Sequence, residues 1–181
     1  TGGNSLSSIN FSGGNNAFLT DGAAAVTSVL DFSGYNGVIT DLTWAVDDFD
    51  NGVTGVTQQV IGTSGSTDTV SASYHAGDDA TAQINMQGIE TFDVDLVDDA
   101  VEMVFDMSLV TGLNLINLTD ASAEPVEFNE LAPGVTIDVT SDLHTAATTV
   151  EVKPATVSGT ETQAFNITAV NTLDEIDLIV A

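Results

Sequence analysis

The stretch Gly88-Ile89-Glu90-Thr91-Phe92-Asp93-Val94 decides the fold of this chain, because it returns further along in altered form. It opens with glycine and continues with apolar and polar residues in alternation, the pattern of a half-buried β-strand. Related copies follow at Gly112-Leu113 and Gly134-Val135, and a fourth, at 173–178, has no glycine before it. Their first apolar residues, Ile89, Leu113, Val135 and Leu173, lie 24, 22 and 38 residues apart.

A second set of short apolar runs lies between these copies. It consists of Val101-Glu102-Met103-Val104-Phe105, Val126-Glu127-Phe128 and Thr149-Val150-Glu151-Val152. A unit of roughly 20–25 residues that holds two short strands is typical of stacked β-coils. We therefore predict an all-β chain folded as a β-solenoid.

In a solenoid, equivalent strands of successive coils lie about 4.8 Å apart and line a continuous apolar column. The residues expected to face inward are Ile89, Phe92, Val94, Leu113, Leu115, Leu118, Val135, Ile137 and Val139. Those expected to face outward are Thr91, Asp93, Asp95, Asn114, Asn117, Thr136 and Asp138. Such an outer face offers short polar groups to cations or to neighbouring molecules.

The repeat begins near residue 88, which divides the chain into 1–87 and 88–181. The first part has less regular strand patterns and dense turn signals, such as Gly34-Tyr35-Asn36-Gly37. One interpretation makes 1–87 an irregular, β-rich capping region of the same solenoid, since terminal repeats are often atypical. The alternative is a separate β-sandwich. The gap before residue 173 is interpreted as one coil with an insertion near 158–162.

The charge balance excludes some partners. The chain has 27 acidic residues, one lysine (Lys153) and no arginine, which gives a net charge of −26. Such a surface repels nucleic acid and anionic lipid headgroups, and no apolar run is long enough to insert into a membrane. A hydrophobic content of 43% argues against a disordered acidic tail. Bound divalent cations or ambient salt are expected to offset the self-repulsion.

The chain contains no cysteine, so disulfides and thiolate sites are excluded. Calcium is the expected staple, because it binds carboxylate and carbonyl oxygens. The candidate ligands are Asp47, Asp48 and Asp50 in one acidic turn, Asp78 with Asp79, and Asp98 with Asp99. The first group lacks the spacing of an EF-hand loop and could instead be a solvated acidic turn. The alternative for each of the two pairs is a repulsive face that keeps a sheet edge from pairing. The two histidines, His75 and His144, lie too far apart in sequence to indicate a zinc site.

No arrangement of residues indicates an enzyme. A nucleophile elbow of the Gly-x-Ser-x-Gly type does not occur. Lys153 alone could neutralise an acidic sugar, which argues against a polyuronate lyase. Tyr35, Trp44 and Tyr74 could form an aromatic platform that binds sugar. We instead expect Trp44 to pack in the core, because it alternates in phase with Leu42.

The phrase opening at Gly88 and the phrase Thr111-Gly112-Leu113-Asn114-Leu115-Ile116-Asn117-Leu118 resemble phrases that recur in surface-layer proteins and related RTX-type exported proteins of Gram-negative bacteria. The resemblance covers residues 66 to 181. It implies a calcium-stabilised β-solenoid, export by a type I system and assembly into a lattice at the cell surface. The chain lacks the glycine-aspartate nonapeptides of RTX proteins, so their calcium rolls cannot be transferred to it.

These observations favour a structural, self-assembling extracellular protein of the surface-layer or filament type. Its expected partners are copies of itself and divalent cations, with calcium as the bound ion, and its expected location is outside the cell at the surface. The alternative is an adhesin or carbohydrate-binding spacer module of a large exported protein. The chain is expected to be a piece of a longer protein, because it starts at Thr1 without a signal sequence.

Overall fold

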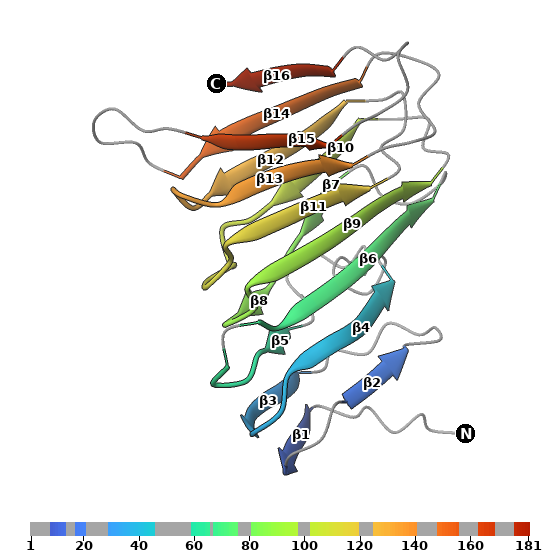
Figure 1. The fold of residues 1–181 in the computed structure, drawn as a ribbon, viewed down its shortest axis with the longest axis vertical. Coiled ribbons are helices and arrows are strands. Elements are labelled where there is room, and N and C mark those ends of the chain that lie inside the picture. The colour runs from blue at the N-terminus through green and yellow to red at the C-terminus, as the bar shows by residue number, and fades with distance from the viewer. Residues whose placement is uncertain are drawn as a thin grey trace.

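The computed structural model describes residues 8–13, 17–20, 29–45, 59–65, 67–75, 81–97, 102–119, 125–140, 148–155, 163–168 and 176–181. These residues form β-strands β1 to β16. They contain no helix, and therefore no helix that could span a membrane. The strands lie one above another along the long axis of the molecule, from blue N-terminal strands to red C-terminal ones (Figure 1). The prediction of an all-β solenoid is confirmed.

The strands form three sheets in which all hydrogen-bonded neighbours are parallel. The seven-stranded long sheet has the order β15 (Ala164–Thr168), β13 (Thr136–Thr140), β11 (Leu115–Thr119), β9 (Thr91–Val97), β6 (Thr69–His75), β4 (Ile39–Ala45) and β2 (Ala17–Thr20). The upper sheet has the order β16 (Ile176–Val180), β14 (Thr148–Pro154), β12 (Val126–Leu131), β10 (Met103–Asp106) and β7 (Thr81–Gln83). The lower sheet has the order β1 (Ser8–Gly13), β3 (Val29–Tyr35), β5 (Gln59–Ile61) and β8 (Met86–Gln87).

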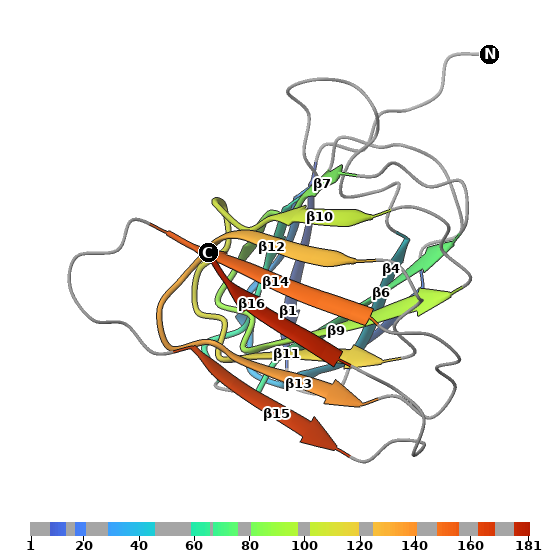
Figure 2. The same ribbon diagram turned by 90° about the horizontal axis from the view of Figure 1, so that it is seen from above.

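The chain alternates between the long sheet and one of the other two, so each coil contributes a strand to each side. Seen from above, the strands of the upper sheet lie on one side of the coils and face those of the long sheet on the other side (Figure 2). The coil of residues 81–97 contributes β7, β8 and β9, and so reaches all three sheets. Beyond β8, a single parallel β-bridge between Gln87 and Thr111 connects the lower sheet to the next coil.

The long sheet continues across the division between 1–87 and 88–181. Strand β6 pairs with β9 from Thr69 opposite Thr91 to His75 opposite Val97. Strands on both sides of the division near residue 88 therefore belong to one hydrogen-bonded sheet.

The predicted rungs lie in adjacent coils. Phe92 of β9 lies opposite Ile116 of β11, which lies opposite Ile137 of β13. Ile89 and Val135 precede these strands and are 0% and 1% exposed. Each opening glycine has a positive φ, namely 63° at Gly88, 89° at Gly112 and 86° at Gly134. The glycines are needed because side chains disfavour this left-handed conformation.

Aromatic side chains fill the interior between the long and upper sheets. The rings of Phe92 and Phe105 meet edge to face with centroids 6.2 Å apart, and Phe105 stacks on Phe128 at 5.2 Å. All three side chains are fully buried. Each is donated by a different coil, so this stack ties neighbouring coils together through the core.

Two details of the predicted register are wrong. The copy at 173–178 does not join the rungs of Ile89, Leu113 and Val135, because β16 pairs with β14 in the upper sheet. The next rung of the long sheet is β15, which pairs with β13. In β11, Ile116 is buried and Leu115 is only half-buried, although Leu115 was predicted to face inward. The other residues predicted to face inward are buried.

Candidate functional site

All seven predicted calcium ligands lie outside the described residues. These are Asp47, Asp48, Asp50, Asp78, Asp79, Asp98 and Asp99. Of the histidines, His75 lies in β6 and His144 lies outside the described residues. Across the part of the chain that the structure describes, no three His, Cys, Asp or Glu side chains are close enough to hold a metal ion. Calcium binding stays a prediction.

The long sheet carries a row of short polar residues on its outer face, which we call the polar ladder. Its members lie opposite one another on successive strands and are Ser71, Asp93, Asn117, Asp138 and Asn166. The first four are partly exposed and Asn166 is exposed. They alternate along their strands with buried residues such as Val94 and Leu118, which places the ladder on the solvent side. The predicted outward residues Asp93, Asn117 and Asp138 are thus confirmed.

Carboxylates and amides alternate along the upper part of this ladder. Asn117 Nδ2 donates a hydrogen bond of 2.6 Å to Asp93 Oδ1. The amide separates Asp93 from Asp138, so two like charges are not directly opposite on neighbouring strands, where they would destabilise the sheet. Asp138 Oδ1 is buried and has no hydrogen-bond partner.

The only lysine of the chain forms an ion pair on the upper sheet. Lys153 Nζ contacts Glu127 Oε2 and lies 3.6 Å from Glu151 Oε1. Glu127 and Glu151 lie opposite each other on β12 and β14, and Glu127 is 7% exposed. The hydrogen bond to Glu127 is the main cause that raises the pKa of Lys153 above its ordinary value of 10.5. Lys153 therefore stays charged at neutral pH and neutralises adjacent like charges.

A buried aspartate joins three coils at one corner of the solenoid. Asp68 is fully buried; its Oδ1 accepts a hydrogen bond of 2.9 Å from Ile39 N, and its Oδ2 accepts one of 2.6 Å from Thr63 N. Asp68 N donates to Glu90 Oε2 at 2.8 Å. Backbone donors satisfy both oxygens of this buried side chain, so the group acts as a structural clamp. Sequence analysis missed both Asp68 and the Glu127–Lys153 pair; the isolated lysine was the one available signal.

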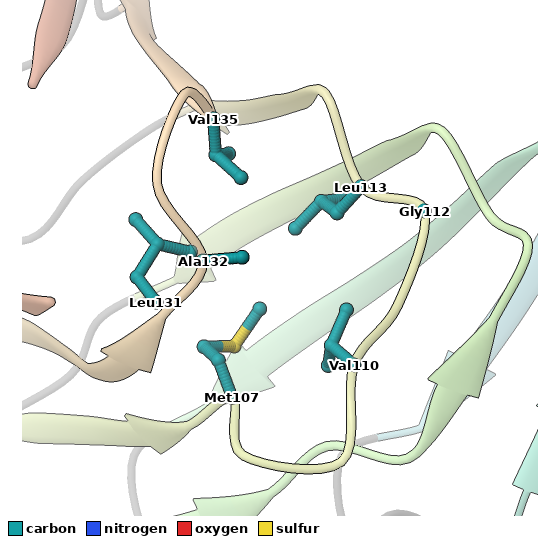
Figure 3. A pocket seen from close by; sticks show the side chains of 7 residues that line it. All are labelled: Met107, Val110, Gly112, Leu113, Leu131, Ala132 and Val135. Atoms are coloured by element: carbon teal, nitrogen blue, oxygen red, sulfur yellow. The ribbon is translucent and has the colours of Figure 1, made fainter. Parts of the chain in front are cut away.

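Among the described residues, an apolar crevice lies between two coils (Figure 3). Met107, Val110 and Leu113 of one coil face Leu131 and Val135 of the next. The crevice has room for about one water molecule, and its walls offer no polar side chain. Its size and lining do not suit a substrate.

No protein-family model, curated protein or solved structure matches this chain. Its function is therefore inferred from its own geometry and charge. Among the aromatic residues considered for a sugar-binding platform, Tyr35 is only 6% exposed. Its ring is therefore not available on the surface, which weakens the alternative of a carbohydrate-binding module.

Proposed function

We propose that this chain is a structural, self-associating scaffold of the surface-layer or filament type, which acts outside the cell and is stabilised by calcium. The observation that carries the proposal is the parallel, in-register stacking of seven strands in the long sheet. A surface of this kind repeats every coil and can be extended by adding another parallel strand. The proposal assigns no catalytic step to the chain.

The edge of the stack formed by β15 and β16 supports self-association. Within the described residues, each of these strands has a sheet neighbour on one side only. Val180 lies opposite the buried Val152, yet it is 55% exposed, and Ile179 beside it is 42% exposed. A further parallel strand would pair with the free backbone groups and cover these side chains.

The charge of the chain supports the role of calcium. A net charge of −26 opposes both folding and association. Divalent cations shared between carboxylates of adjacent molecules would reduce this repulsion. The polar ladder offers oxygen ligands of the type that calcium prefers.

The proposal is tested by negative-stain electron microscopy and thermal unfolding of the purified protein with calcium and with a chelator. We expect filaments or sheets with calcium, dispersed particles with chelator, and a higher melting temperature with calcium. Val180→Lys should block assembly at the edge, since lysine on an edge strand opposes pairing. Leu109→Lys is the matched control, because Leu109 is 40% exposed in a turn away from the edge.

Two results would contradict the proposal. Melting curves that are the same with calcium and with chelator would contradict stabilisation by calcium. Self-association through this edge would be contradicted if the particles stay dispersed under every condition. It would also be contradicted if the Val180→Lys protein assembles like the unmodified chain.

A further inference from the structure

The turn between β3 and β4 contains an exposed asparagine followed by glycine. Asn36, Gly37 and Val38 connect the two strands. The residues on either side are anchored: Tyr35 is 6% exposed and Ile39 is fully buried. The Ile39 amide is held further by its hydrogen bond of 2.9 Å to Asp68. The connection is therefore short and fixed at both ends, while Asn36 projects into solvent.

Packing explains why residue 37 is glycine. A Cβ atom at this position would lie 2.5 Å from Cε1 and 2.6 Å from Cζ and Oη of Tyr35. Atoms of a real side chain do not approach so closely, so any other residue here would require the buried ring of Tyr35 to move. The fold thus places a residue without a side chain directly after the exposed side chain of Asn36.

We propose that Asn36 is a site of spontaneous deamidation, with the backbone nitrogen of Gly37 as the nucleophile. The nitrogen of Gly37 bonds to Cγ of Asn36, and the Cγ–Nδ2 bond breaks. Ammonia leaves with the proton that Gly37 N gives up, and a cyclic succinimide remains. Water then opens either carbonyl of the ring, which gives aspartate or isoaspartate. Water is the only co-reactant.

The surroundings of Asn36 favour this reaction. Glycine has no Cβ atom, so no side chain hinders the approach of its nitrogen to the preceding side chain. Within the described residues, the Gly37 amide donates no hydrogen bond that would hold it away. The exposed asparagines Asn114 and Asn166 are followed by the bulky residues Leu115 and Ile167, and a second Asn-Gly pair, Asn51-Gly52, lies outside the described residues.

The two products differ in their effect on the fold. Aspartate adds one negative charge at an exposed position and leaves the backbone unchanged. Isoaspartate inserts an additional carbon atom into the backbone of the short connection between Tyr35 and Ile39. Because both anchors are buried, we expect isoaspartate to loosen the lower sheet and its pairing with the following coils.

The experiment incubates the folded protein at mildly alkaline pH, followed by chymotryptic peptide mapping and labelling with an isoaspartyl methyltransferase. We expect peptides with Asn36 to gain the mass of an amide-to-acid conversion and to accept label several-fold faster than peptides with Asn114 or Asn166. These two serve as internal controls. Retention of the amide at Asn36 under conditions that convert a synthetic peptide of the same sequence would overturn the proposal.

Two variants separate the chemistry from its consequence. Asn36→Gln should abolish conversion at this position, because the ring it would have to form is larger and closes slowly. Asn36→Asp supplies the charge without the inserted carbon, so it should keep the melting temperature of the fresh protein. Incubated unmodified protein should melt at a lower temperature than either variant incubated alongside it. Conversion in Asn36→Gln at the unmodified rate would assign the reaction to another residue.

Discussion

Replacement of Asp68 by alanine removes the carboxylate that joins the coil of Ile39 to the coil of Thr63. In the structure its two oxygens accept hydrogen bonds from the buried amides of Ile39 and Thr63, at 2.9 and 2.6 Å. Alanine leaves both donors without a partner, and each buried unpaired donor costs about 1–3 kcal/mol. We expect the free energy of unfolding to fall by about 2–6 kcal/mol, a large share of the 5–15 kcal/mol typical of a domain.

The measurement is urea denaturation followed by circular dichroism, with hydrogen exchange at the amides of Ile39 and Thr63. In a solenoid each coil contacts its neighbours alone, so the amides near Asp68 should lose protection before those of the upper sheet. Asp68→Asn should cost less, because one oxygen still accepts and only the amide nitrogen faces a donor.

Asp31→Ala is the matched control for this prediction. Asp31 accepts a hydrogen bond of 2.9 Å from Ser33 N at an exposed site, and hydrogen bonds from Ser33 lower the pKa of Asp31. Water replaces this partner, so the loss of stability should be much smaller than for Asp68→Ala. If Asp68→Ala loses no more stability than Asp31→Ala, the clamp is not a principal interaction between coils.

Three further predictions concern the core, the corner glycines and the lysine. Phe105→Ala should cost about 3–5 kcal/mol in urea denaturation, since it breaks an aromatic stack across three coils; a loss below 1 kcal/mol would show that the coils do not depend on it. Gly134→Ala should cost about 1–2 kcal/mol through its positive φ alone, because no atom lies within 4 Å of the added carbon. Glu130→Gly should stabilise by up to about 1 kcal/mol, because Glu130 has a φ of 54°. Equal urea midpoints for the unmodified protein and these two variants would refute backbone strain. Lys153→Met should lower the melting temperature below pH 10.5 and have no effect once the pH exceeds the raised pKa of Lys153, since its stabilisation is lost as it deprotonates; a difference that persists above that pKa would exclude the ion pair as its cause.

The solenoid and most of its inward residues could be predicted from local patterns. Side chains alternate across a strand, so the parity of Ile137 and Val139 decides which face is buried. Glycine before each strand marked the corner, because the backbone there needs a positive φ. Phe92 does not alternate in phase with Ile89, because Ile89 belongs to the corner and β9 begins at Thr91.

The assignment of strands to sheets depended on the tertiary structure. Strands of the long and upper sheets share the same alternation and the same spacing, so the copy at 173–178 could not be assigned from its sequence. Leu115 and Ile116 are adjacent apolar residues, and only pairing with β9 and β13 decides which of them is buried.

The polar contacts also required the fold. Asp68 meets Ile39 across 29 residues of sequence, and Lys153 meets Glu127 across 26. Coil stacking brings such residues together, and nothing in their local sequence distinguishes Asp68 from the other aspartates. Period and parity are local properties of a strand and can be seen in the sequence, whereas the partner of a buried charge is set by which coil lies next to it.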